Sequence, residues 1–447
     1  MMNTNSKLEP KSYKLVCGAE IHVELRTKSK MFCGCKNDPF GAEKPNIYTC
    51  PVCLGMPGAL PVPNKKAIED CILIGLALHC QISEVSKFDR KHYFYPDLGK
   101  GYQISQYDEP FCTGGYVDTS FGRVGITRVH MEEDTAKLHH EEIVGVGSSN
   151  PEKVSLIDFN RSSVPLVEIV SDPDIKSPEQ AKEFLKKVRD IVRAVGVSDC
   201  DMDKGSMRLE ANISLTADGS LPSYKVEVKN INSFRYFANS IEFEIKRQTE
   251  ILAAGEIPKQ ETRGYRPDGS TASQRGKEGA ADYRYFPEPD IPPFRISREM
   301  VASIATRLPQ LPEEIIAELI GYGVPESTAK VLCNDKKALA FIREVNTKDN
   351  KLTSKVAGAI ANKKIDITTL SPAEYVQSES ARSADRISDP IELTKLVEQV
   401  IGANEKSVAD YRAGKIAAFG YLMGQIMKLS GGKADTAKAK EILTNSV

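Results

Sequence analysis

Strict alternation of polar and apolar residues marks three stretches in the first half of the chain. Glu20, His22 and Glu24 are separated by branched aliphatic residues. Because successive side chains of a β-strand point to opposite faces, this spacing predicts a strand with two carboxylates and an imidazole on one face. The alternation recurs at 208–215 and 225–229, where the polar positions are held by Arg208, Glu210, Asn212, Ser214, Lys225, Glu227 and Lys229.

These polar strand faces have two explanations. A single strand of this kind is typical of an ordinary antiparallel sheet with one face in water. Three strands with the same polar face favour a shared functional surface instead.

Three other stretches show the periodicity of amphipathic helices. One follows Asn64, one begins after Ser177 and ends before Gly196, and one covers 233–254. Each begins after a residue that commonly caps helices. Between them, strand-like segments are separated by turn signals and should pair antiparallel. The first 290 residues therefore predict an α+β domain built on a large antiparallel sheet.

Two changes in composition indicate domain boundaries. A proline-rich run at 287–293 is followed by helical periodicity with few strand signals. A Ser-, Arg- and Asp-rich stretch at 378–389 precedes a compact helical tail. We expect a catalytic domain at 1–293, a helical domain at 294–400 and a helical tail at 401–447.

Charge and hydropathy restrict the possible partners. The 447 residues are 40% hydrophobic and 27% charged, which is typical of a globular protein, and 60 basic residues nearly balance 61 acidic ones. A polyanionic partner must therefore be held by a local patch. The first residues lack the apolar core of a signal peptide, and the apolar stretches are too short to cross a bilayer. We expect a cytoplasmic protein without a membrane-spanning segment.

Four of the ten cysteines are clustered. A C-x-C pair and a C-x-x-C pair, fourteen residues apart, could surround one tetrahedral zinc ion. Free thiols are the alternative, and the other cysteines are scattered singly as in a reducing compartment. With four thiolates and no open position, the predicted zinc site is structural; its ligands are Cys33, Cys35, Cys50 and Cys53.

The chain has neither a phosphate loop of the G-x-x-x-x-G-K-[ST] type nor a dinucleotide-binding glycine motif. A phosphate-handling enzyme without these loops must hold its nucleotide through metal ions and side chains on a sheet. The polar faces offer Mg²⁺ ligands in Glu20, His22, Glu210 and Glu227, and positive charge in Lys229, Arg208 and Lys91.

Three further segments are ambiguous. Consecutive Glu132 and Glu133 must point to opposite faces, so only one can reach the shared surface, and an exposed acidic turn is the alternative. Aromatic and basic residues alternate at 91–103, which suits base stacking or an ordinary hairpin. The arginine-rich segment 260–286 is a long functional loop or a surface insertion. No acyl-transfer nucleophile stands out, because Cys17 should face away from Glu20 and His22.

Several motifs resemble the GatB family, whose members are subunits of the aspartyl/glutamyl-tRNA amidotransferases. They are Ala19-Glu-Ile-His-Val-Glu-Leu25, Lys91-His-Tyr-Phe-Tyr-Pro-Asp97, Gly101-Tyr-Gln-Ile-Ser-Gln106, Gly125-Ile-Thr-Arg-Val-His-Met-Glu-Glu-Asp134, Val164-Pro-Leu-Val-Glu-Ile-Val-Ser171, Val226-Glu-Val-Lys-Asn-Ile-Asn-Ser-Phe-Arg235 and Asp282-Tyr-Arg-Tyr-Phe-Pro-Glu-Pro-Asp290. The tail, with Val408-Ala-Asp-Tyr-Arg-Ala-Gly-Lys415, resembles the family's YqeY-like end.

This resemblance implies a fold and an activity. The fold is a cradle related to glutamine synthetase, followed by a helical domain and a YqeY-like tail. The activity is ATP- and Mg²⁺-dependent amidation of mischarged Glu-tRNA(Gln), Asp-tRNA(Asn) or both. The side-chain carboxylate is phosphorylated and then attacked by ammonia. The ammonia comes from a GatA-like amidase partner, and a small GatC-like subunit completes a heterotrimer.

By position, the resemblance implies a magnesium site lined by Glu20, His22, Glu133, Glu210 and Glu227, with Lys91, Glu132 and Lys229 beside it. Arg208 and Lys229 are expected to contact the nucleotide, and the cysteine quartet resembles the zinc-bearing subset of the family. Glu210 stands where an aspartate is expected, and the region before the tail is abbreviated. The alternatives are a zinc-stapled tRNA-binding scaffold without catalysis, and a ligase that acts on free glutamate.

Overall fold

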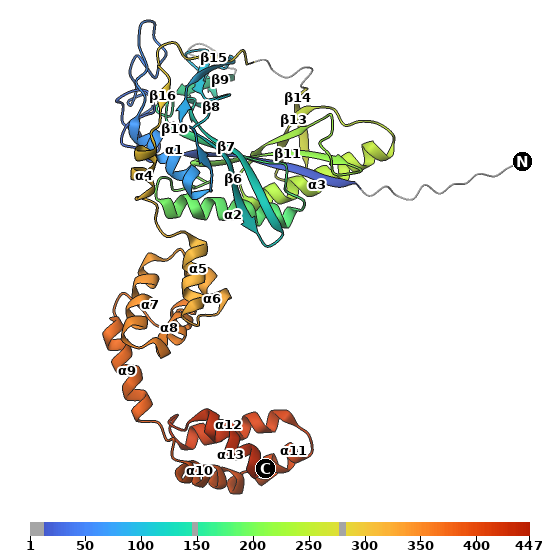
Figure 1. Ribbon diagram of the computed structural model, residues 1–447. Coiled ribbons are helices and arrows are strands. Elements are labelled where there is room, and N and C mark those ends of the chain that lie inside the picture. The colour runs from blue at the N-terminus through green and yellow to red at the C-terminus, as the bar shows by residue number, and fades with distance from the viewer. Residues whose placement is uncertain (1–12, 145–150, 277–282) are drawn as a thin grey trace, which may run out of the picture. The chain divides into compact units, whose positions relative to one another are not determined.

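The computed structural model describes residues 13–144, 151–276 and 283–447, and the chain forms two compact units. The first unit covers Met1–Pro312 and the second Glu313–Val447. The first unit contains the polar strands singled out in the sequence (Figure 1).

A nine-stranded sheet organises the first unit, in the order β14-β13-β12-β11-β1-β10-β7-β6-β2. Neighbouring strands are antiparallel except for β12 and β13, which are parallel. The strands are β1 (Lys14–Glu24), β2 (Gln81–Ile82), β6 (Cys112–Thr119), β7 (Gly122–Glu133), β10 (Pro165–Ser171), β11 (Met207–Thr216), β12 (Val226–Ile231), β13 (Glu261–Tyr265) and β14 (Thr271–Gly276).

Three smaller sheets complete the strand content described for this unit. Their orders are β15-β4-β5, β16-β3 and β8-β9. The strands are β3 (Val85–Ser86), β4 (Asp89–His92), β5 (Tyr102–Ser105), β8 (Lys137–Val144), β9 (Pro151–Asp158), β15 (Phe286–Pro287) and β16 (Phe294–Arg295).

The three helices predicted from periodicity are confirmed. The side chains of Asn64, Ser177 and Ser233 each accept backbone N–H groups at the start of a helix. Gly196 ends the second of these in the left-handed region, with φ 82°, which an L-residue with a side chain rarely adopts. The helices of the unit are α1 (Lys65–Ala77), α2 (Pro178–Val195), α3 (Phe234–Ala253) and α4 (Arg298–Ala305).

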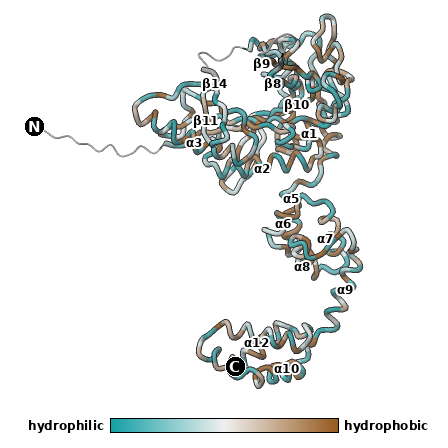
Figure 2. The backbone as a smooth tube through the Cα atoms, turned by 180° about the vertical axis from the view of Figure 1, so that it is seen from behind, coloured by the Kyte–Doolittle hydropathy of each residue, from teal (hydrophilic) through white to brown (hydrophobic). Residues whose placement is uncertain are grey.

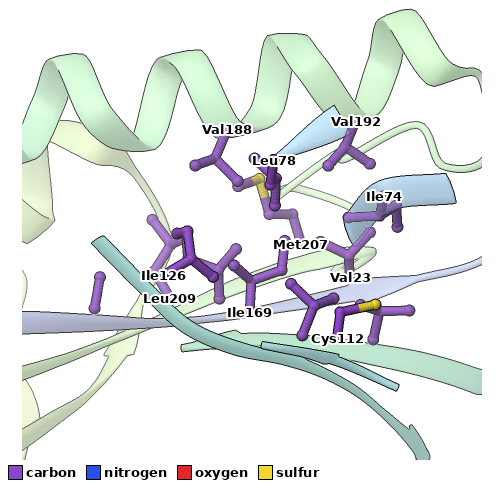
Figure 3. Close-up of a cluster of buried hydrophobic side chains, with 14 of the residues drawn as sticks. Val23, Ile74, Leu78, Cys112, Ile126, Ile169, Val188, Val192, Met207 and Leu209 are labelled. Carbon is purple, nitrogen blue, oxygen red and sulfur yellow. The ribbon is translucent and has the colours of Figure 1, made fainter. Parts of the chain in front are cut away.

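The core of the first unit lies between the large sheet and its helices. Val188 and Val192 of α2 face Ile169 of β10 and Leu209 of β11, and all four are fully buried or nearly so (Figure 3). The apolar positions of the alternating strands thus face α2, and the polar positions face the opposite side of the sheet. This confirms the mixed sheet-and-helix character expected from the sequence.

The second unit is helical throughout its described residues, and it contains two separate apolar clusters. One cluster is built around Leu319, Ile342 and Val356, and the other around Val397 and Leu422. Hydrophobic and hydrophilic residues alternate along α10 (Figure 2). The helices are α5 (Pro312–Gly321), α6 (Glu326–Leu332), α7 (Lys336–Lys348), η1 (Asn350–Leu352), α8 (Thr353–Ala361), α9 (Pro372–Ala384), α10 (Pro390–Ala403), α11 (Glu405–Arg412), α12 (Ile416–Leu429) and α13 (Thr436–Ser446).

Among the helices described in either unit, none combines the length and the apolar character that crossing a lipid bilayer requires.

A glycine tests how tightly α1 packs on the sheet. A Cβ built on Gly75 would clash with the Cys112 side chain, at 2.8 Å from its Cβ. We expect Gly75→Ala to lower the free energy of unfolding of the first unit by about 1–3 kcal/mol, measured by urea denaturation. The control is Gly358→Ala in α8, where nothing lies within 4 Å, and where stability should stay equal or rise by up to about 1 kcal/mol. Equal effects of both substitutions would contradict the close packing.

Candidate functional site

Three carboxylates from adjacent strands form the first group of the site. Glu20 of β1 lies directly opposite Glu210 of β11, and Glu227 lies on the next strand, β12. One ligand oxygen from each lies within 4.8 Å of the others. Lys229 Nζ lies 2.8 Å from Glu210 Oε2 and 3.4 Å from Glu227 Oε1. We call this set the β11-side group.

The β11-side group concentrates negative charge in a partly buried place. Burial raises the pKa of Glu20, and the neighbouring carboxylates Glu168 and Glu210 raise it further. Asn212 Nδ2 donates to Glu20 Oε1 at 2.8 Å and opposes this effect. Burial lowers the pKa of Lys229, but its carboxylate neighbours outweigh burial, so the net shift is upward. The group can therefore attract a cation beyond the single lysine.

His22, Glu132 and Glu168 form a second group, which we call the β10-side group. They come from β1, β7 and β10, and their ligand atoms lie within 4.8 Å of one another. His22 Nε2 lies 3.6 Å from Glu168 Oε2, and His130 Nε2 lies 3.3 Å from the same oxygen. Lys91 Nζ lies 3.3 Å from Glu132 Oε1. His22 Nδ1 is buried and has no hydrogen-bond partner.

Glu132 is held in place by several donors. Ser105 Oγ donates to Glu132 Oε1 at 2.7 Å, and Gln103 Nε2 donates to Glu132 Oε2 at 3.0 Å. Burial alone would raise its pKa, but the positive charge of Lys91 and the contact with His130 hold it well below the ordinary range. For Glu168, burial is likewise outweighed by His130, and the pKa falls to about 2. Both carboxylates are therefore ionised at neutral pH.

The structure places Glu133 apart from both groups. Its Oε1 accepts the backbone N–H of Ile104 at 3.0 Å and pairs with the ammonium of Lys100. Consecutive residues of β7 point to opposite faces, so the side chain of Glu133 leaves the face on which Glu132 lies. Of the two glutamates, Glu132 is the one that reaches the shared surface.

Arg208 lies opposite His22 in the sheet and makes contacts of its own. Its Nη1 lies 2.8 Å from Asp134 Oδ2 and 3.5 Å from Glu24 Oε1. Burial and the nearby Asp134 raise the pKa of Glu24 to about 9, so Glu24 is protonated at neutral pH and hydrogen-bonds to Asp134. Arg208 and Glu24 thus form a charged and protonated border beside the β10-side group.

The four clustered cysteines converge as their spacing predicted. Their sulfur atoms lie within 4.8 Å of one another, and Cys50 N donates to Cys53 Sγ at 3.1 Å. A hydrogen bond from Cys33 and the charge of Lys30 lower the pKa of Cys53 to about 5. Lys30 is fully buried and donates to the carbonyls of Tyr48 and Phe159 at 2.7 and 3.1 Å. Four converging thiols suit a tetrahedral soft-metal ion.

Sequence reasoning missed Glu168 and His130 as members of the site. Glu168 is the charged residue in the otherwise apolar stretch of β10, and this isolation was the available signal. His130 occupies the position two before Glu132 and therefore shares its face. The expected single ligand set is divided in the structure between two neighbouring groups, linked by the alternating residues Glu20 and His22 of β1.

The two groups define what the site can do. Carboxylate oxygens are the ligands that Mg²⁺ prefers, and an imidazole can complete the shell. Lysines beside them can neutralise phosphoryl oxygens. Such a combination is suited to binding a polyphosphate through a divalent cation and transferring a phosphoryl group.

Comparisons with known proteins agree with this chemistry. Residues 15–302 match the model of the GatB/GatE catalytic domain, and residues 332–447 match that of the GatB domain. Similar curated proteins are named as GatB-type subunits of aspartyl/glutamyl-tRNA(Asn/Gln) amidotransferase. The one from Dehalococcoides mccartyi is 42% identical over 97% of this chain and 99% of its own length. The one from Caldicellulosiruptor saccharolyticus is 41% identical over 96% and 98%. One from Clostridium acetobutylicum is 42% identical over 97% and 98%. The chain therefore belongs to the GatB family.

Proposed function

We propose that this chain is the subunit of a tRNA-dependent amidotransferase that activates and amidates mischarged aminoacyl-tRNA with ATP. The substrates are Glu-tRNA(Gln), Asp-tRNA(Asn) or both. The observation that carries the proposal is the convergence of Lys91 with the ionised Glu132 and Glu168 and with His22 at one buried point of the sheet. Membership of the GatB family supports it.

The reaction needs a leaving group, because a carboxylate is a poor electrophile. An oxygen of the substrate's side-chain carboxylate attacks the γ-phosphorus of ATP, and ADP leaves. The acyl phosphate is then attacked by ammonia at its carbonyl carbon, and inorganic phosphate leaves as the amide forms. Lys91 is placed to neutralise phosphoryl oxygens during the first step, and Lys229 serves the same purpose beside the β11-side group.

The residues present fit Mg²⁺. The donor set is carboxylate and imidazole, and the unpartnered Nδ1 of His22 shows that this ring is not committed to another buried hydrogen bond. We propose that the β10-side and β11-side groups hold the cation, which would neutralise charge on the phosphates. Glu133, paired with Lys100, positions the end of β7. Arg208 contributes positive charge from the border and keeps Asp134 in place.

The four cysteines are proposed to hold a structural zinc ion. The two short loops that carry them offer four sulfur donors and no place for a fifth ligand. Their position between the end of β1 and the start of α1 suggests a role in fixing that connection.

The proposed assembly is a heterotrimer with a GatA-like amidase, which supplies ammonia, and a small GatC-like subunit, acting on tRNA in the cytoplasm. The names of the relatives designate them as one subunit of several. Cys17, beside the site in sequence, supports an external ammonia source. It is fully buried, and burial raises its pKa to about 12, so it is not a nucleophile. We further propose a cradle related to glutamine synthetase, with domain limits of 1–293, 294–400 and 401–447.

The His22 side chain provides the direct test of the site. In the reconstituted complex, His22→Ala should reduce ATP-dependent amide formation on mischarged tRNA by about 100-fold or more, because a cation ligand is lost. His139→Ala, which removes an exposed histidine of β8, is the matched control and should leave the rate unchanged. Full activity of His22→Ala would refute the proposed site. Binding of tRNA without ATP turnover by the wild-type complex would favour a non-catalytic scaffold, and amidation of free glutamate would favour a stand-alone ligase.

Metal analysis tests the cysteine site separately. Purified wild-type protein should contain about one zinc ion per chain, and Cys50→Ser should contain little, because the replacement removes one thiolate of four. Cys333→Ala, in the other unit, should keep the full zinc content. Substoichiometric zinc in the wild-type protein, or full zinc in Cys50→Ser, would count against the site.

A further inference from the structure

A small sheet lies over the β10-side group and presents two different faces. Successive residues of β4 alternate, so Lys91 lies on one face, and Arg90 and His92 lie on the other. The Arg90 face is occupied by its own contacts. The Arg90 side chain donates to Glu288 at 2.7 and 2.9 Å and stacks over Tyr102 with 4.3 Å from Cζ to the ring centroid.

The Lys91 face turns toward the carboxylates and carries tyrosines. Lys91 lies directly opposite Gln103 of β5, and both contact Glu132. Four tyrosines gather around this lysine from three separate segments of the chain, and we call them the tyrosine face: Tyr93, Tyr107, Tyr283 and Tyr285.

The rings of the tyrosine face form a continuous series. Tyr107 and Tyr285 are stacked, with centroids 4.3 Å apart and planes at 12°. Tyr285 meets Tyr283 edge to face at 6.1 Å, and Tyr283 meets Tyr93 in the same way at 6.2 Å. Lys91 Nζ lies 5.5 Å from the centroid of the Tyr283 ring. The series therefore extends from the ammonium group that faces the carboxylates to the stacked pair.

The exposure of the outermost ring distinguishes this face from ordinary core packing. Tyr107 is 54% exposed, although it is stacked on another ring. Of the four hydroxyls, that of Tyr93 has a hydrogen-bond partner in the described part of the chain, Gln103 Oε1 at 3.2 Å. A cluster serving only the core would bury its rings and satisfy its hydroxyls. This one leaves an aromatic surface and free polar atoms in water.

We propose that the tyrosine face binds the adenine base of ATP. Aromatic side chains offer stacking surfaces to planar bases, and the groups next to them are those that hold a polyphosphate: an ammonium and a carboxylate–imidazole cation site. A base on the exposed end of the series leaves its phosphate chain directed to Lys91 and Glu132. This inference rests on the proposed ATP-dependent function and adds the place of the base.

The test separates the base from the phosphates. With the complete complex, we would measure the affinities of ATP and of inorganic tripolyphosphate, each with Mg²⁺. Tyr107→Ala should weaken ATP on the order of tenfold, which is the size expected for loss of one stacking contact, and should leave tripolyphosphate unchanged. Tyr107→Phe keeps the ring and should stay within about twofold of the wild-type affinity.

Phe121→Ala is the matched control, because Phe121 is 57% exposed in the turn between β6 and β7. It should change neither affinity. A wild-type complex that binds ATP while Tyr107→Ala binds it equally well overturns the inference and leaves the proposed function intact. Equal weakening of ATP and tripolyphosphate also overturns it, since the loss would then not involve the base.

A third readout covers the other adenine available to this site, the terminal adenosine of tRNA. A raised KM for mischarged tRNA with unchanged ATP affinity in Tyr107→Ala would overturn the assignment to ATP. A wild-type complex that binds no ATP at all would overturn both this inference and the proposed function. Loss of ATP affinity confined to Tyr107→Ala, with recovery in Tyr107→Phe, supports the tyrosine face.

Discussion

The register of β1 between β10 and β11 is the constraint on which the site depends. It sets Glu20 opposite Glu210 on one side and His22 opposite Glu168 on the other. Because side chains alternate, a slip of one residue would turn both polar side chains toward α2 and bring Ile21 to the polar face. The fully buried Ile21 and Val23 make such a slip costly, since each would lose its place in the core. The apolar face of the strand thus fixes the geometry of its polar face.

Charge balance explains how so many ionisable groups remain together below the surface. Glu132 and Glu168 are both buried and ionised, and they share Lys91, His22 and His130 as neighbours. Buried ion pairs contribute little net stability, because desolvation offsets most of their attraction. Such an arrangement is retained for what it does, and a bound polyphosphate with its cation would join a network that is already polarised. The Glu24 proton illustrates the limit, because beside Asp134 a second negative charge is not tolerated.

Much of this architecture could be read from the sequence, and the exceptions have physical causes. Periodicity and capping residues located α1, α2 and α3, and alternation located the polar strands, because both patterns are local. The cysteine spacing likewise placed four sulfurs together. Sequence could not divide the ligands into two groups, since that depends on strand order, which puts β10 and not β12 beside β1. For the same reason Glu168 was missed and Glu133 was overvalued. The tyrosine face joins residues about 190 positions apart, and no local pattern relates Tyr93 to Tyr283.

The position of β1 in the sheet has a consequence for how the protein is made. It is the first strand of the chain, yet its two partners are β10 and β11, which end at Ser171 and Thr216. During synthesis, its apolar face and both of its unpaired edges must wait until some two hundred further residues have emerged. An exposed strand of this kind is prone to pair with other chains. The nascent segment therefore has a long interval in which a chaperone, or transient collapse onto α1, must cover it.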